Sequence, residues 1–265
     1  MSLFTLMLPG AGAVGLMMIV IWYLGVRYHD VSFVDRVWGL GFLLAMSGYL
    51  WEIGGVDLRS GLTFACVAIW GLRLSWHLHR RNSGHGEDPR YTAMRNKIGP
   101  SFVWKSFLRV NLLQAVILLI VSTPLAVIAR GGGDQFPTLF DLIGFSIYVI
   151  GLGFEVIGDA QLKVFKANPA NRGQVLRSGL WGLTRHPNYF GDSLLWWGFG
   201  IVSLSCPGGY WTLIGPALMS FLLRRVSGVT LLEADLVQRK PGYANYIAEV
   251  PPFWPRLWPR PRVKE

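Results

Sequence analysis

Long apolar runs alternate with short polar and basic segments along almost the whole chain. A helix that crosses a bilayer needs roughly 20 mostly apolar residues. By that measure the sequence predicts an all-α polytopic membrane bundle of about seven spanning helices, with approximate limits Pro9–Val26, Phe33–Trp51, Gly61–Leu78, Phe107–Ala129, Leu139–Asp159, Tyr189–Ser205 and Tyr210–Leu223. The first run lacks the positive segment and cleavage site of a secretory signal, so we expect it to be kept as a span.

The distribution of Lys and Arg predicts the orientation of these spans. Basic residues crowd the segments after the third, fifth and seventh spans, whereas the opposite loops offer only Arg59 and Arg130. Because basic loops stay on the cytoplasmic side of a membrane, we expect the N-terminus to lie outside and the C-terminus in the cytoplasm. The polar motifs of the chain then all face the cytoplasm.

Composition supports a membrane protein with one domain over residues 1–265. The chain is 52% hydrophobic and 15% charged, while soluble domains carry roughly 25% charged residues. The net charge of +10 is accounted for by the basic loops, so we expect no nucleic-acid partner. The two cysteines, Cys66 and Cys206, form no ligand pattern with other residues, and we expect no metal.

The most polar stretch beside an apolar run is Gly179–Gly200, which reads GLWGLTRHPNYFGDSLLWWGFG. Pro187 suits the first turn of a helix, where its missing N–H costs nothing. Such a helix presents free N–H groups and a positive dipole end, which suit a phosphate group. The alternative is a cytoplasmic loop whose charges only mark the membrane boundary. We favour a binding site, since five hydrogen-bonding residues gather at this helix entrance: Arg185, His186, Asn188, Tyr189 and Asp192.

RHPNYFGD followed by WWG resembles the C-terminal half of the steroid 5-alpha-reductase superfamily, and most closely its bacterial DUF1295 branch. Members of that branch read SRHPNYFGE, so Thr184 and Asp192 depart from the pattern. The run Gly86–Tyr91 resembles the GEDxRY signature of the same branch. The resemblance extends from about Asp30 to Trp254 and implies a cofactor-binding half at about residues 139–254. Isoprenylcysteine and phospholipid methyltransferases share the RHP-x-Y core, so the motif alone leaves both activities open.

The resemblance implies a membrane-embedded NADPH-dependent reductase of an activated C=C bond, such as an enone, in a hydrophobic steroid-like or lipid substrate. The substrate would come from the bilayer, and the active site would open to the cytoplasm at a bacterial inner membrane. The alternative is a methyltransferase that uses S-adenosylmethionine on a lipid or lipidated substrate. Since that cofactor lacks phosphates, the many Arg and Lys residues beside the motifs favour NADPH. A transporter would be expected to show internal repeats with broken helices, and the sequence shows none.

Three residues are candidates for catalysis. In the reductase superfamily a Glu near Glu52 polarises the substrate carbonyl, and a Tyr near His77 acts with it as proton donor. The predicted topology places Glu52 near the outer face, however. Arg73, His77 and Arg80 share one helical face, which either faces a functional site or only meets the membrane interface, with Arg73 reaching out to the headgroups. Tyr91 of the GEDxRY-like motif is the third candidate. Asp35, just before the apolar part of the second span, either caps that helix or pairs with Arg36.

The candidate cofactor ligands lie in the second half of the chain. Glu155, Asp159, Lys163 and Lys166 form a single helical stripe. Placing the two acids of this stripe inside a membrane is costly, so we favour a functional role for the stripe over helix stabilisation alone. Asn168-Pro predicts a turn, and Tyr243 and Tyr246 share one face of a short helix. The full set is Asp159, Lys163, Lys166, Arg172, Arg185, His186, Asn188, Tyr189, Asp192, Glu233, Tyr243 and Tyr246.

Overall fold

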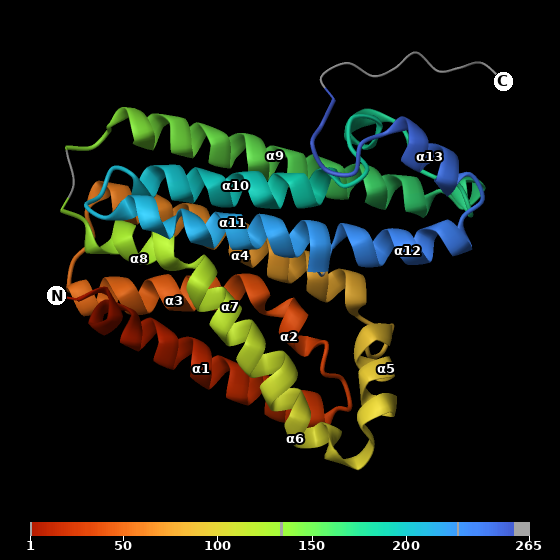
Figure 1. Cartoon of the computed structure of the whole chain (residues 1–265), viewed down its shortest axis with the longest axis horizontal. Helices are drawn as coiled ribbons and strands as arrows, with labels where there is room; N and C mark the ends of the chain where they lie inside the picture. Colours follow the sequence, from red (N-terminus) through yellow and green to blue (C-terminus); the bar gives the residue numbers. More distant parts are fainter. Residues whose placement is uncertain (1, 133–134, 227, 257–265) are drawn as a thin grey trace. The chain divides into compact units, whose positions relative to one another are not determined.

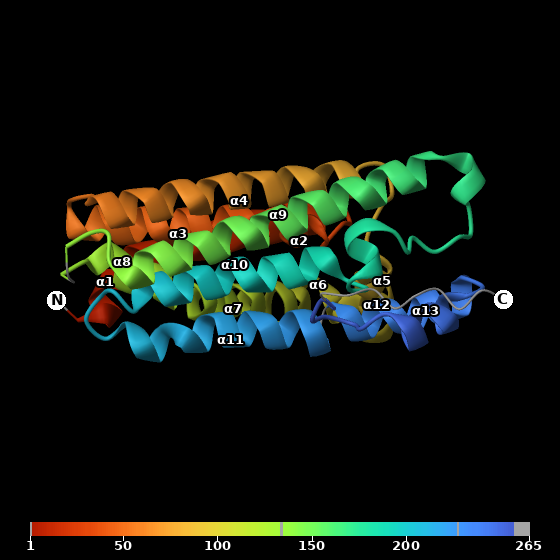
Figure 2. The ribbon, with the colours of Figure 1, turned by 90° about the horizontal axis from the view of Figure 1, so that it is seen from above.

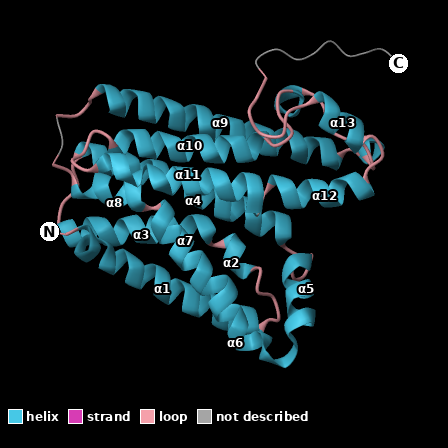
Figure 3. Ribbon diagram, viewed as in Figure 1, coloured by secondary structure: helices cyan, strands magenta, loops and turns pink. Residues whose placement is uncertain are grey.

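All the regular secondary structure in the described part of the chain is helical. A computed structural model describes residues 2–132, 135–226 and 228–256, and in these ranges helices are joined by loops without any strand (Figure 3). The prediction of an all-α fold is confirmed. Among the described residues three helical segments are long and apolar enough to cross a membrane, namely Leu3–Arg27, Pro89–Val121 and Leu139–Ala167.

The first of two compact units comprises the chain up to Thr138 together with Ser203–Thr212. Its helices approach closely where two glycines face each other. A Cβ on Gly39 of α3 would lie 2.4 Å from the carbonyl oxygen of Gly71 on α4, and the two helices run side by side in Figure 2. The helices of this unit are α1 (Leu3–Arg27), α2 (Phe33–Arg36), α3 (Trp38–Ile53), α4 (Leu58–Asn82), α5 (Pro89–Ile98), α6 (Phe102–Ser106), α7 (Leu113–Val121) and α8 (Thr123–Arg130).

Two of the predicted spans are interrupted in the structure. The run predicted as Phe33–Trp51 divides at Val37 into α2 and α3. The run predicted as Phe107–Ala129 begins with a π-helical turn and divides at Ser122. The second break has a clear cause, because Pro124 has no N–H to donate and its ring disfavours continuation of the preceding helix. The hydropathy of the sequence gives no sign of either break.

The second unit comprises Leu139–Val202 and the chain from Leu213 onward. Its two longest helices pack through glycines spaced seven residues apart, Gly144 and Gly151 on α9 against Gly191 and Gly198 on α10. Figures 1 and 2 both show these helices side by side. The helices of this unit are α9 (Leu139–Ala167), α10 (Pro187–Ser203), α11 (Ile214–Phe221), α12 (Val229–Arg239) and α13 (Tyr243–Glu249).

Local sequence signals set the boundaries next to the RHPNYFGD motif. The Asn168 side chain accepts a hydrogen bond from the Ala170 N–H at 3.0 Å, which closes the predicted turn after α9. α10 begins at Pro187, as predicted from its position in the motif. The residues just before Pro187 therefore lie at the entrance of α10, where the candidate site is formed.

Candidate functional site

The guanidinium group of Arg185 lies at the centre of a buried clamp. Its Nε donates to Glu233 Oε1 at 2.6 Å and its Nη2 to Glu233 Oε2 at 3.0 Å. Its Nη1 donates to the backbone oxygens of Ile247 (2.9 Å) and Val250. Four of the five N–H donors of an arginine are thereby used within the second unit. Arg185 therefore has mainly a structural role, because it joins α10 to α12 and α13. Only one of its N–H donors remains for a phosphate.

His186 completes this clamp by binding the same Glu233 oxygen as Arg185 Nε. Its Nε2 lies 2.9 Å from Glu233 Oε1, and its ring stacks parallel to that of Tyr189, with centroids 5.5 Å apart. Burial of the Glu233 carboxyl opposes its ionisation, but the hydrogen bonds from His186 and Arg185 outweigh that effect and hold its pKa below the ordinary value of 4.5. Glu233 is therefore a carboxylate at neutral pH.

We expect this carboxylate to make the protein acid-sensitive. A group whose pKa is lowered by folding stabilises the native state above its ordinary pKa, and that stabilisation is lost as the pH falls through the lower folded value. The melting temperature of the wild type should therefore drop below about pH 4.5 more steeply than that of Glu233→Gln. The variant should be less stable at pH 7, because it loses the ion pairs. Parallel pH profiles of the two proteins would contradict this assignment.

The segment Val250–Arg256, which we call the C-terminal strap, pairs with the residues before α10. The Arg185 N–H donates to Pro251 O at 2.9 Å, and the Arg256 N–H donates to Leu183 O at 2.9 Å. Between these two bonds the Thr184 hydroxyl donates to Phe253 O at 3.0 Å. The strap is thus fixed along its length to Leu183, Thr184 and Arg185, at the start of the RHPNYFGD motif.

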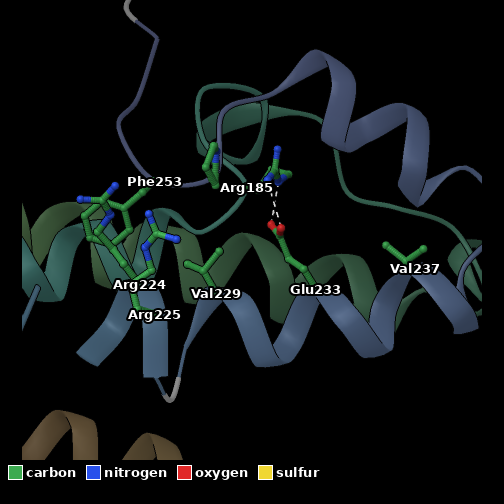
Figure 4. A pocket seen from close by; sticks show the side chains of 8 residues that line it. Arg185, Arg224, Arg225, Val229, Glu233, Val237 and Phe253 are labelled. Atoms are coloured by element: carbon green, nitrogen blue, oxygen red, sulfur yellow. Dashed lines mark hydrogen bonds and ion pairs between the residues drawn. The ribbon is translucent and has the colours of Figure 1, made fainter. Parts of the chain in front are cut away.

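A cavity of about 440 Å³ lies beside the clamp and the strap, within the second unit. Its volume is within the range of small-molecule sites. Figure 4 shows Val229, Glu233 and Val237, spaced four residues apart, pointing to the same side of α12. The polar lining consists of Arg185, Arg224, Arg225 and Glu233, and the apolar lining of Val229, Val237, Pro252 and Phe253.

Arg224 and Arg225 are the functional candidates that the sequence interpretation missed. Both lie in a π-helical turn, Leu222–Val226, that follows α11, and such turns are frequent at functional sites. The guanidinium carbon of Arg224 lies 5.4 Å from the centroid of the Phe253 ring. In the sequence, two arginines after the last apolar run look the same as ordinary membrane anchors. No local signal separates the two roles.

Other predicted ligands take part in internal bonds. The Asn188 amide donates to Asp159 Oδ1 at 3.1 Å, and its oxygen accepts from the Tyr189 N–H at 3.0 Å. Tyr243 and Tyr246 lie on the short helix α13, as their spacing predicts, and both are buried there. Burial raises the pKa of each phenol. The Tyr246 hydroxyl donates to Trp181 O at 2.6 Å. The remaining predicted ligands are the half-buried Asp192 and the exposed Lys163, Lys166 and Arg172.

A second polar cluster lies in the first unit around Asp35. Its Oδ1 accepts from the Tyr91 hydroxyl at 2.9 Å and from the Gln114 amide at 3.3 Å, and its Oδ2 accepts from Arg90 at 3.0 Å. The suggested pairing of Asp35 with Arg36 is wrong, because Arg36 pairs with Asp30 at 2.6 Å. These hydrogen bonds hold Arg90 and Tyr91 of the GEDPRY run against Asp35.

Glu87 of the same run is anchored in the same way. It pairs with Arg95 at 2.7 Å and accepts from the Val31 N–H at 3.0 Å. Burial opposes its ionisation, but these hydrogen bonds hold the pKa of its carboxyl below the usual value. The GEDxRY-like motif therefore has a structural explanation that does not require a ligand.

The catalytic candidates of the first unit do not converge. Glu52 lies in the last turn of α3, next to the start of α4 at Leu58. His77 lies roughly 28 Å along α4 from Leu58, at a rise of 1.5 Å per residue. Glu52 and His77 therefore cannot act together on one carbonyl within this unit. Tyr91 is bonded to Asp35, away from the Glu52 end of α3.

We expect Tyr91→Phe to report on the role of that hydroxyl. Removal of one buried hydrogen bond should lower the stability by about 1 kcal/mol, because Asp35 keeps Arg90 and Gln114 as donors. A thermal melt measures this effect. Gln114→Leu, which removes a weaker donor to the same carboxylate, is the control. A turnover rate that falls far more in Tyr91→Phe than in Gln114→Leu, at equal stability, would instead give the Tyr91 hydroxyl a catalytic role.

Comparison with known proteins decides the family. A model of the family described as "Protein of unknown function (DUF1295)" matches residues 21–250. The chain belongs to the DUF1295 family. This DUF1295 chain is 24% identical to an uncharacterised protein of Schizosaccharomyces pombe over a 271-residue alignment, which covers 90% of the chain and 76% of that relative.

A second relative of the DUF1295 chain has a named activity. A probable O-methyltransferase, ustE, of Ustilaginoidea virens is 36% identical over 73 residues. That match covers 28% of the chain and 26% of the relative, so the chain spans about a quarter of the length of this methyltransferase. No solved structure matches the chain.

Proposed function

We propose that this DUF1295 protein is a membrane-embedded reductase that binds NADPH in the cavity of the second unit. Its substrate would be a hydrophobic molecule with an activated C=C bond, such as an enone, taken from the bilayer. The proposal rests on the resemblance of RHPNYFGD and WWG to the steroid 5-alpha-reductase superfamily and on the charge of the cavity. Seven spans with a cytoplasmic C-terminus would give the cavity access to the cytoplasmic pool of reduced cofactor.

The observation that carries the proposal is the excess of positive charge in the cavity. Among the residues that the structure describes, three arginines and one glutamate line it, and the glutamate is already neutralised by the ion pair with Arg185. Arg224 and Arg225 thus supply the net charge, beside apolar walls that suit a flat ring. A guanidinium fork matches phosphate oxygens in shape and charge, so this lining fits the pyrophosphate and 2′-phosphate of NADPH.

The residues of the cavity would have separate roles in binding NADPH. Arg224 and Arg225 would hold the phosphates, and Phe253, Val229 and Val237 would flank an aromatic base. Arg185 and Glu233 would keep the entrance of α10 in place. NADPH would supply the hydride. The roles expected of His77, Glu52 and Tyr91 in polarising or protonating the substrate stay predictions for each residue singly, since Glu52 and His77 do not act on the same carbonyl.

A methyltransferase that uses S-adenosylmethionine is the second candidate function. The 36% identity to a probable O-methyltransferase over 73 residues favours it. The charge of the cavity argues against it, because S-adenosylmethionine carries a sulfonium cation and no phosphate. The one carboxylate of S-adenosylmethionine could pair with one arginine, but a second arginine would face a molecule of net positive charge. A lipid or lipidated molecule would then be the methyl acceptor.

Binding of NADPH and of S-adenosylmethionine to the full chain, purified in detergent, separates the two functions. We expect the wild type to bind NADPH, and the double variant Arg224→Gln, Arg225→Gln to bind it about 100-fold more weakly, at about tenfold per lost charged contact. Arg239→Gln is the matched control, since Arg239 lies exposed on α12 and is not part of the cavity lining. Binding of S-adenosylmethionine alone would refute the reductase.

A further inference from the structure

Thr184 lies just outside the cavity and makes a bond that no ligand-binding role explains. Its side chain is fully buried. The hydroxyl donates to the backbone oxygen of Phe253 at 3.0 Å, while its oxygen accepts a longer hydrogen bond, 3.4 Å, from the His186 N–H. Thr184 therefore connects the entrance of α10 to the one aromatic residue among those that line the cavity.

Phe253 in turn connects the strap to a cavity cation. Its ring is 2% exposed and packs edge-on against Phe190, with centroids 6.0 Å apart. Arg224 lies over the ring at 5.4 Å, within the distance at which a ring face attracts a guanidinium. A shift of the Phe253 backbone would move the ring. Arg224, which lies over the face of that ring, would then lose its present position.

We propose that Thr184 is a positioning residue that holds the Phe253 ring so that Arg224 is aimed into the cavity. The bonds from Arg185 N–H to Pro251 O and from Arg256 N–H to Leu183 O hold the strap on either side, whereas the Thr184 bond is made to Phe253 itself. Thr184 touches no ligand and acts through the ring. The expected effect on cofactor affinity rests on the function proposed above.

Thr184→Val tests this role, because valine keeps the shape of threonine and loses the donor. We expect the Kd for NADPH to rise about fivefold, as for the loss of one hydrogen bond. Thr184→Ser keeps the hydroxyl and should restore wild-type affinity. Equal affinity in Thr184→Val and wild type would overturn the proposal, as would a loss in Thr184→Ser as large as that in Thr184→Val.

A double-mutant cycle with Arg224→Gln separates positioning from general loosening of the fold. If Thr184 acts through Arg224, Thr184→Val should cause no further loss of affinity in the Arg224→Gln background. The same fivefold loss in both backgrounds would overturn the proposal. If Thr184→Val melts well below the wild type, Thr184→Ala, which also removes the hydroxyl donor to Phe253 O, takes its place in the cycle.

Hydrogen exchange of the ligand-free full chain distinguishes a failure of this proposal from a failure of the reductase. We expect faster exchange of the strap amides of Val250, Phe253, Trp254 and Arg256 in Thr184→Val than in wild type or Thr184→Ser, with exchange in the packed part of α9 unchanged. If the wild type binds no NADPH, the reductase is refuted, and this exchange measurement decides whether Thr184 positions Phe253. Unchanged exchange of the strap in Thr184→Val would overturn the proposal.

Discussion

Arg185→Ala should destabilise the second unit by about 3–5 kcal/mol, as expected when one partner of a buried ion pair is removed. The substitution leaves the Glu233 carboxylate with His186 alone and deprives the Ile247 and Val250 carbonyls of their side-chain donor. Each abandoned buried acceptor loses its bond without gaining water. A thermal melt of the detergent-purified protein, or exchange of the α12 and α13 amides, would measure the loss.

Arg177→Ala is the matched control for this prediction. Arg177 also contacts the C-terminal region, through Glu249 at 3.1 Å and Gly242 O at 2.8 Å. The Arg177 and Glu249 side chains are 37% and 57% exposed, so we expect a loss of only about 1 kcal/mol. Arg185→Lys should rescue little, because an ammonium cannot reproduce the fork. Equal melting temperatures for Arg185→Ala and Arg177→Ala would disprove the structural role of the clamp.

Gly151→Val should separate α9 from α10. A Cβ at Gly151 would lie 2.5 Å from the Leu195 nitrogen and 2.7 Å from the Gly191 oxygen, and neither atom can rotate away because both belong to a helix backbone. Overpacking of this kind costs up to about 3 kcal/mol and occasionally more. We expect a large drop in the yield of folded protein and in its melting temperature.

Gly153→Val provides the comparison on the same helix. A Cβ at Gly153 meets no atom within 4 Å, so valine should be accepted there with a change of well under 1 kcal/mol. Both variants make the same chemical change in α9, and only the contact with α10 differs between them. Similar melting temperatures for the two would show that the glycine contact contributes little to the packing.

Local features of the site were predictable from the sequence, whereas its long-range partners were not. The start of α10 at Pro187, the turn at Asn168 and the shared face of Tyr243 and Tyr246 follow from neighbouring residues alone. Arg185 and Glu233 are 48 positions apart, and no spacing rule links residues so distant. An arginine at a helix entrance looks the same in the sequence whether it binds a phosphate or a carboxylate of its own chain.

The predicted spans show the same difference between what neighbouring residues determine and what they do not. Continuous apolar runs predicted α1 and α9, because length and hydropathy are properties of one segment. The breaks at Val37 and Ser122 interrupt runs that remain apolar on both sides, so hydropathy carries no sign of them. The cavity escaped prediction for a similar reason, since Phe253 reaches Arg224 only after the chain has turned back past α13.

The clamp around Arg185 also constrains the order in which the protein can mature during synthesis. The motif that begins α10 leaves the ribosome well before Ile247, Val250 and Pro251, which accept its hydrogen bonds. Until that last stretch is made, the guanidinium group of the nascent chain has none of these backbone partners at the entrance of α10. We therefore expect the second unit to complete its folding only after translation is nearly finished, and a chain cut short before Ile247 to be handled by the cell as misfolded.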